Sequence, residues 1–145
     1  MYRPIIGVIA LAWTIAGGTA AAADEPAENP AAIEAAVAAA EKWLSLVDQG
    51  QYASSWETAA AYFRNAIRRD QWDQAARAVR QPLGDLVSRK LKSTDVKTSL
   101  PGAPDGQYVV IQFETAFQFK QAAVETVTPM RQQDGTWAVS GYFIK

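Results

Sequence analysis

Carboxylates and tyrosines are the side chains left to carry acid–base chemistry in this sequence, because its 145 residues include no histidine and no cysteine. A Ser-His-Asp triad, a zinc site with histidine ligands and a thiol nucleophile are therefore excluded. A carboxylate acts as a base when it sits in an apolar wall beside a donor for the developing oxyanion. The question is whether the sequence places any carboxylate in that setting.

No acid–base constellation emerges from the spacing. Glu114 falls on the polar face of its predicted strand, and Glu125 alternates with apolar residues in a segment whose direction the pattern leaves open. Tyr52, Tyr62, Tyr108 and Tyr142 are possible donors, but nothing in the sequence fixes one beside a carboxylate. We therefore predict no catalytic residue, no cofactor and no metal site, and keep a small carboxylate/tyrosine pocket enzyme as an alternative.

Arg89 is predicted to point inward. Val87, Arg89 and Leu91 share one face of a predicted strand, opposite Lys90 and Lys92. A buried arginine needs a carboxylate, and its planar guanidinium accommodates two oxygens at once. The candidate partner is Glu125. A buried ion pair that fixes strand register is favoured over an arginine that anchors a ligand.

Trp43 is the remaining pocket candidate. Trp56, Trp72 and Trp137 fall on helical or strand stripes, which is typical of core residues. Trp43 lies off the main stripe of its helix, so it could belong to an aromatic ligand cage. We favour a core position for the tryptophans as a group.

Charge changes sign along the chain. Residues 24–63 hold seven acids and one base, whereas residues 64–97 hold nine bases and four acids. Arg64, Arg68 and Arg69 form a possible basic patch for anionic lipid, a polyanion or an acidic partner. The favoured interpretation is local: Arg68, Arg69, Arg77 and Arg80 complement the dipoles in the last turns of helices. A sequence pI of about 5.4 argues against nucleic acid.

The N-terminal residues 1–23 have the pattern of a secretory signal peptide. Arg3 precedes an apolar run over residues 5–16, and Ala21-Ala22-Ala23 fits the small-residue cleavage site. The run is shorter than the roughly 20 residues that span a membrane. We expect cleavage near Ala23, a periplasmic or secreted protein and no integral membrane anchor. Residues 24–34 are then an acidic lead-in with the start of the first helix, and residues 35–145 form one domain.

Three helices are predicted first. Asn29 and Pro30 suit the start of a helix that Gly50 ends. Ser54 and Glu57 suggest a capping box for a second helix carrying Trp56, Ala60, Phe63 and Ile67. A third is expected to start at Asp70 and to end by Pro82 and Gly84.

Four strands should follow. They are expected around residues 86–98, 107–120, 123–131 and 136–144, and odd positions of the second, from Val109 to Phe119, should face the core. Pro129 indicates an edge strand or a bulge. The fold class is α+β, with three N-terminal helices packed on a four-stranded antiparallel meander.

Several segments in series resemble a known family. They are residues 43–56, 80–84, 88–89, 100–108, 124–128 and 137–144. Together they are similar to the bacterial family called domain of unknown function 4019, whose members are mostly small exported proteins. The resemblance covers residues 35–144 and implies, more loosely, a cystatin-like or nuclear-transport-factor-2-like cone. It implies no catalytic residue.

The expected function is a non-enzymatic binding or assembly module. Its partner would be a second copy of the chain or another envelope protein, and no nucleic acid is expected. The alternatives are the pocket enzyme and a homodimeric structural domain that pairs through its open sheet face.

Overall fold

The computed structural model describes residues 29–145, so the predicted signal peptide lies outside the described residues. Four helices precede four strands. They are α1 (Pro30–Asp48), α2 (Tyr52–Thr58), α3 (Ala61–Ala66), α4 (Arg69–Leu83), β1 (Leu86–Lys97), β2 (Tyr108–Phe117), β3 (Lys120–Arg131) and β4 (Trp137–Ile144).

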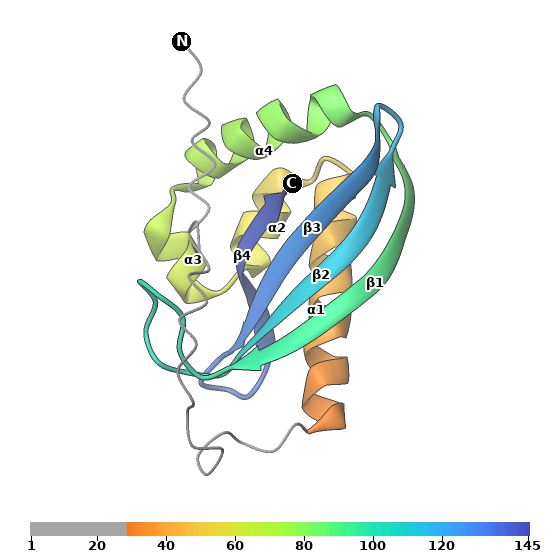
Figure 1. Ribbon diagram of the computed structural model, residues 1–145. Coiled ribbons are helices and arrows are strands. Elements are labelled where there is room, and N and C mark those ends of the chain that lie inside the picture. Colours follow the sequence, from red (N-terminus) through yellow and green to blue (C-terminus); the bar gives the residue numbers. More distant parts are fainter. Residues whose placement is uncertain (1–28) are drawn as a thin grey trace.

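The strands form one antiparallel sheet in the order β1-β2-β3-β4. Figure 1 shows that the sheet is curved, that α1 and α2 lie on one of its faces, and that α4 crosses its upper end. Helix α1 packs mainly against β3 and β4. The α+β class and the four-stranded meander are confirmed. No helix in residues 29–145 is long and apolar enough to cross a membrane.

Helix α1 starts as its sequence predicts. The side chain of Asn29 accepts a hydrogen bond of 3.1 Å from the backbone N–H of Ala31, and Pro30 occupies the first turn, where its missing N–H costs nothing. Five residues of one face are buried: Ala36, Ala40, Trp43, Leu44 and Val47. Asp48 is the last residue of the helix, and Gly50 follows with a φ of 73°.

The prediction of three helices is wrong, because the second one is divided. Ala59 and Ala60 adopt extended conformations, and Ala60 N–H donates a 2.8 Å hydrogen bond to the carbonyl of Val139 in β4. This tertiary bond satisfies the edge of β4 where local helix propensity would have continued the helix. The expected capping box does not form either, since α2 begins at Tyr52 and Ser54 is already helical.

Helix α4 also starts earlier than expected. Its N-cap is Arg68, and Asp70 lies in the first turn rather than at the cap. Gly84 ends the helix with a φ of 72° and a ψ of −158°, a conformation that is essentially restricted to glycine. A Cβ atom at Gly84 would lie 2.8 Å from the ring of Phe119, so the chain needs a glycine here for two reasons.

The strands lie close to their predicted positions, with one error at the β2–β3 turn. Phe119 was predicted to face the core as part of a strand, but it lies in the turn and is 70% exposed. Phe117 pairs with Lys120, so the hairpin is tight and β3 begins at Lys120 rather than at Ala123. Pro129 lies in a central strand, at the register shift that directly follows Thr128. Thr128 pairs with Gly141 and Pro129 with Val139, so a bulge is present here.

Strand β1 departs from simple alternation. Its pairing with β2 shifts between Leu86 and Ser88 and again between Leu91 and Ser93. The prediction that Val87 shares the buried face of Arg89 is therefore wrong, since Val87 lies in the first bulge and is 68% exposed; Leu91 does share the face of Arg89 but is 46% exposed at the edge of the sheet. Each bulge inserts one residue and so resets which side chains face the core.

The main core fills the space between the helices and the sheet. Its central members are large apolar residues from three helices, α1, α3 and α4, and from three strands, β2, β3 and β4. They include Trp43, Phe63, Trp72, Ile111, Phe113, Val127, Val139 and Tyr142. A smaller cluster of Leu100, Tyr108 and Val110 lies at the loop that joins β1 to β2. With no cysteine in the chain, packing stabilises this fold without disulfides.

Candidate functional site

The most unusual feature of the interior is a network of charged side chains around Arg89. Its Nε atom donates to Glu125 Oε1 at 2.7 Å. Its two Nη atoms donate to Asp48, at 2.8 Å to Oδ2 and at 2.9 Å to Oδ1. One guanidinium thus joins β1 to the end of α1 and to β3, and its geometry with Asp48 is the two-pronged pairing that suits arginine best.

Sheet register brings Arg89 and Glu125 together. Arg89 lies opposite Thr115, and Phe113 lies opposite Glu125, so all four share the face that points to the helices. Thr115 Oγ1 adds a 2.6 Å hydrogen bond to Glu125 Oε1. The glutamate is fully buried.

Tyr142 reaches the same glutamate from β4. Its hydroxyl donates to Glu125 Oε2, so both oxygens of the glutamate have donors. Burial, followed by the negative charge of Glu125, raises the pKa of Tyr142 well above its usual value. The phenol therefore stays protonated and is a hydrogen-bond donor at neutral pH.

Arg80 completes the network from α4. Its Nη2 atom donates to Asp48 Oδ1 at 2.8 Å, and its guanidinium carbon lies 4.7 Å from the ring centre of Phe117. The residue is only 6% exposed. Its Nε and Nη1 atoms are buried without a hydrogen-bond partner among residues 29–145.

Asp48 is the carboxylate that joins the two arginines. Burial alone would raise its pKa, but the hydrogen bonds from Arg89 and Arg80 lower it by more, so the pKa lies below its usual value. The cluster then holds two cations and two anions, Arg80 and Arg89 with Asp48 and Glu125. This balance makes burial of four charges tolerable.

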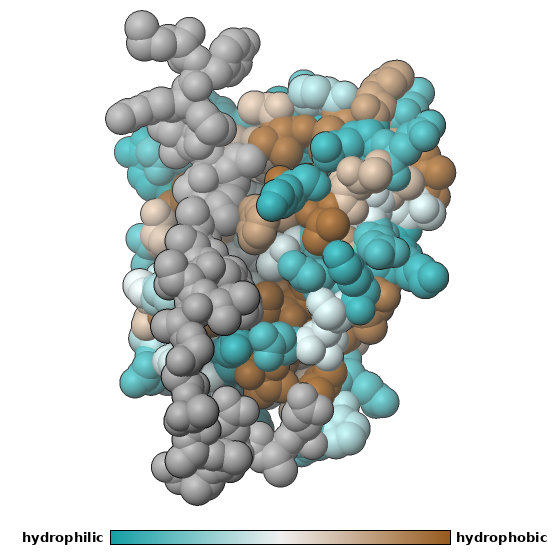
Figure 2. Space-filling model, viewed as in Figure 1, coloured by the Kyte–Doolittle hydropathy of each residue, from teal (hydrophilic) through white to brown (hydrophobic). Residues whose placement is uncertain are grey.

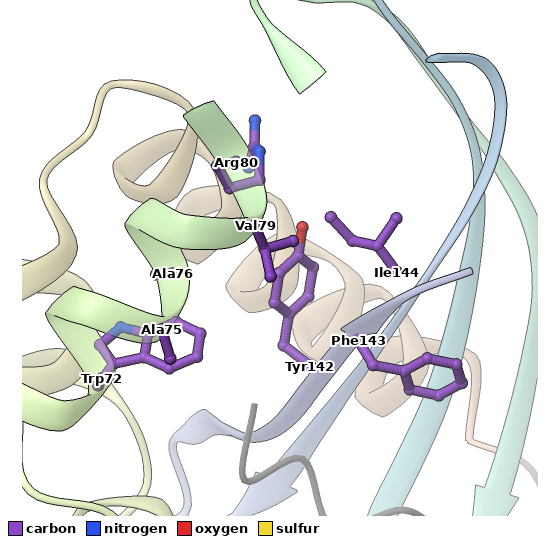
Figure 3. A pocket seen from close by; sticks show the side chains of 8 residues that line it. All are labelled: Trp72, Ala75, Ala76, Val79, Arg80, Tyr142, Phe143 and Ile144. Carbon is purple, nitrogen blue, oxygen red and sulfur yellow. The ribbon is translucent and has the colours of Figure 1, made fainter. Parts of the chain in front are cut away.

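A small cavity lies between α4 and β4, and Figure 3 shows its lining. Trp72, Ala76 and Val79 come from α4, and Tyr142 rises from β4 with its hydroxyl on the side of Arg80. The cavity volume of about 10 Å³ is no more than one water molecule needs. Arg80 is a polar group that such a water would satisfy.

Comparison with known proteins gives a family for this arrangement. Residues 39–142 match the family model described as "Protein of unknown function (DUF4019)". The chain belongs to the DUF4019 family. No curated protein and no solved structure matches it.

In this DUF4019 domain, Trp43 is part of the core and lines no open cage. It is 3% exposed, and its Nε1 atom donates to the carbonyl of Ser55 at 2.8 Å. Its ring lies 5.2 Å from that of Tyr142 and 5.7 Å from that of Trp72, centre to centre. Trp43 therefore supports the tyrosine that binds Glu125.

The three arginines of the predicted basic patch lie apart from the network and on the surface. Arg68 pairs with Asp70 at 3.4 Å, and Arg69 pairs with Glu57 at 3.0 Å. Only Arg64 lies in the last turn of a helix. The dipole argument is wrong for Arg68 and Arg69, which lie at the start of α4, because the predicted second helix ends before it reaches them.

Sequence reasoning named Arg89 and Glu125 but missed Asp48 and Arg80 as members of one cluster. One signal was available for Asp48, which is an acid in the last turn of a helix, where the dipole disfavours a negative charge. A residue in that position often has a cation nearby. For Arg80 the pattern gave only a place near the end of α4. No group of three or more acidic residues within residues 29–145 is placed to hold a metal ion.

Proposed function

We propose that this protein is exported and acts as a non-enzymatic binding or assembly module of the bacterial cell envelope. The observation that carries the proposal is the state of Glu125, which within residues 29–145 is the one fully buried carboxylate that contacts a tyrosine. Its Oε1 accepts from Arg89 and Thr115, and its Oε2 accepts from Tyr142. Both oxygens already accept hydrogen bonds inside a fully buried site, so a substrate would have to enter the core or displace a donor to use Glu125 as a base.

The space around Glu125 supports the same conclusion. Tyr142 and Trp43 pack against each other beside it, and the cavity next to Tyr142 holds about one water molecule. Small-molecule sites in proteins are typically about 300–1,000 Å³. A protein with such a closed interior works through its surface. The charged side chains inside it link β1, β3, α1 and α4 to one another.

We also propose that the domain has a cystatin-like or nuclear-transport-factor-2-like cone fold. A long first helix against a curved meander supports it, as Figure 1 shows. Many functions occur on such frameworks, so the fold restricts the function little.

Export is tested by expressing the chain with its own N-terminus in a Gram-negative host. We expect the protein in the osmotic-shock fraction, with Asp24 as its first residue, because residues 1–23 have the order of a cleaved signal peptide. Recovery from the membrane pellet with Met1 still present would contradict export as a soluble protein.

The closed interior is tested by thermal unfolding against a library of small carboxylates, sterols and other apolar compounds. We expect no compound to raise the melting temperature through the interior. A compound that raises it for the wild type but not for Glu125→Gln would show an interior ligand site and refute the closed interior.

A further inference from the structure

Large apolar side chains are exposed at one end of the sheet. Val87 is 68% exposed at the first bulge of β1, and Phe119 is 70% exposed in the β2–β3 turn. Backbone hydrogen bonds tie this turn to the residues just before β1, from Phe119 N–H to Leu83 at 2.9 Å and from Gln118 N–H to Asp85 at 2.8 Å. Both apolar residues therefore lie at the same end of the molecule.

A phenylalanine is an unusual residue for a tight turn, where Gly, Asn, Asp and Ser dominate. Burial in the fold does not explain Phe119, since most of its surface is in water. Leu91, further along β1, is 46% exposed as well. Exposed apolar groups that lie together mark an interaction surface.

Cations follow these apolar residues along the chain. Lys90 and Lys92 are exposed on β1, and Lys120 follows Phe119 directly. The charge of Arg89 in the same strand is balanced inside by Asp48 and Glu125. Glu114 lies opposite Lys90 in the sheet and Asp85 directly precedes β1, so this part of the sheet holds three lysines and two acids. We call Val87, Phe119, Lys90, Lys92 and Lys120 the lysine–phenylalanine tip.

Two protein partners fit this tip poorly. Strand addition to the β1 edge is hindered by two bulges and by lysines, which are the devices that block edge pairing. A second copy that met this tip across a two-fold axis through β1 would bring lysines close to lysines. In Figure 1 the β2–β3 turn projects beyond the end of α4, and Figure 2 shows apolar and hydrophilic atoms side by side there. A projecting tip enters a deformable layer without needing a matching cavity.

We propose that the lysine–phenylalanine tip docks the protein on a membrane surface that contains anionic lipid. Phe119 enters the boundary between headgroups and acyl chains, and the lysines contact the lipid phosphates. The proposal rests on the proposed function, in which the protein works through its surface, and it names an anionic bilayer as the partner. Docking is reversible, because one aromatic side chain and three lysines give a weak anchor.

The test is co-sedimentation of the purified protein with vesicles at about 0.1 M salt, within the range where surface charges still act. One vesicle type contains equal amounts of phosphatidylglycerol and phosphatidylcholine, and the other only phosphatidylcholine. We expect binding to the anionic vesicles alone. Phe119→Ser should weaken it by about tenfold, and Lys90→Gln with Lys92→Gln should weaken it by more than tenfold. All variants carry the same N-terminus, so differences between them report on the tip.

The matched control is Arg64→Gln with Arg68→Gln. Like the lysine double variant it removes two positive charges, but from the region where α3 ends and α4 begins. It should change binding to the anionic vesicles less than twofold. Equal binding to both vesicle types, tip variants that bind like the wild type, or a control as weak as the lysine double variant would each overturn the proposal. Thermal unfolding verifies that each variant is folded, which we expect because the changed side chains are exposed.

A second measurement uses the absence of cysteine from the chain. Gln118→Cys carries an environment-sensitive dye beside Phe119, and Gln74→Cys carries it on the exposed side of α4. Anionic vesicles should shift the emission of the dye at residue 118 to the blue and leave that at residue 74 unchanged. The reverse pattern would refute docking through the tip. Failure of docking would leave the proposed export and closed interior unaffected, because neither is measured with vesicles.

Discussion

Replacing Arg89 by methionine tests whether the interior network holds the domain together. The arginine side chain is 12% exposed, and within residues 29–145 it is the one cation paired with Glu125, which is fully buried. Without it, the cluster has one cation for two carboxylates. Breaking a buried ion pair in this way costs about 3–5 kcal/mol of unfolding free energy. We expect Arg89→Met to be folded but destabilised by that amount.

The double variant decides whether the loss comes from the unpaired charge. Glu125→Gln removes the negative charge and keeps one acceptor oxygen, so it can accept from Thr115 or from Tyr142 but not from both, and its amide N–H2 occupies the other position. Alone it should cost about 2 kcal/mol, since Arg89 retains Asp48. Combined with Arg89→Met it leaves a neutral cluster of Arg80 and Asp48, so the total loss should be about 2–3 kcal/mol, well below the sum of the single losses.

Urea unfolding followed by tryptophan fluorescence and circular dichroism measures these differences. Arg69→Met is the control, because its pair with Glu57 is more than half exposed and is worth at most about 1 kcal/mol. Additive losses in the double variant, or an Arg89→Met variant destabilised no more than the control, would refute the network as a source of stability.

Four further predictions concern the titration of Tyr142 and of Asp48, the turn glycines and the surface arginines. The pKa of Tyr142 is raised in the folded state, so the free energy of unfolding that this phenol contributes is fully present below about pH 10 and is lost as the pH rises towards the folded pKa. In urea unfolding, Tyr142→Phe should remove this loss of stability at alkaline pH. At neutral pH the same change should cost about 1–3 kcal/mol. The pKa of Asp48 is lowered in the folded state, so the stability that this carboxylate contributes is present above about pH 4 and is lost as the pH falls through the folded pKa. Asp48→Asn should therefore make the free energy of unfolding depend less on pH in this acidic range. An unchanged pH dependence would contradict a lowered pKa for Asp48. Gly84→Ala should lower the free energy of unfolding by about 2–3 kcal/mol, because of its backbone conformation and because the new Cβ atom would contact Phe119. Gly50 has a similar φ but open space around it, so Gly50→Ala should cost only about 1 kcal/mol. Equal losses would contradict the contact with Phe119. Replacing Arg64, Arg68 and Arg69 together by Gln should change stability by at most about 1 kcal/mol and leave heparin binding weak, and strong wild-type retention on heparin that the triple change abolishes would restore the basic-patch interpretation.

Local patterns were sufficient for most of the secondary structure. Asn29, Pro30 and Gly50 bound α1 through rules that involve neighbouring residues only. The alternation from Val109 to Phe117 predicted β2 and its buried face, because a strand repeats every two residues whatever packs on it. The inward direction of Arg89 also followed from alternation; Leu91 shares its face but is half exposed at the sheet edge, and the first bulge displaces Val87.

Tertiary contacts decided the rest. The break at Ala59 and Ala60 depends on a hydrogen bond to Val139, which lies 79 positions further along the chain and leaves no local signal at Ala60. The bulges in β1 depend on how that strand twists against β2, so its exposed residues could not be assigned by counting.

The sequence by itself determined the absence of histidine and cysteine chemistry, the order of helices before strands, and one pair of charged residues, because these depend on residue type and short-range periodicity. Only the tertiary structure decided that Asp48 and Arg80 join that pair, since they approach Arg89 from the ends of two different helices. It also decided that Trp43 belongs to a closed core and that Phe119 projects into water, because burial is a property of what packs against a side chain and not of the side chain itself.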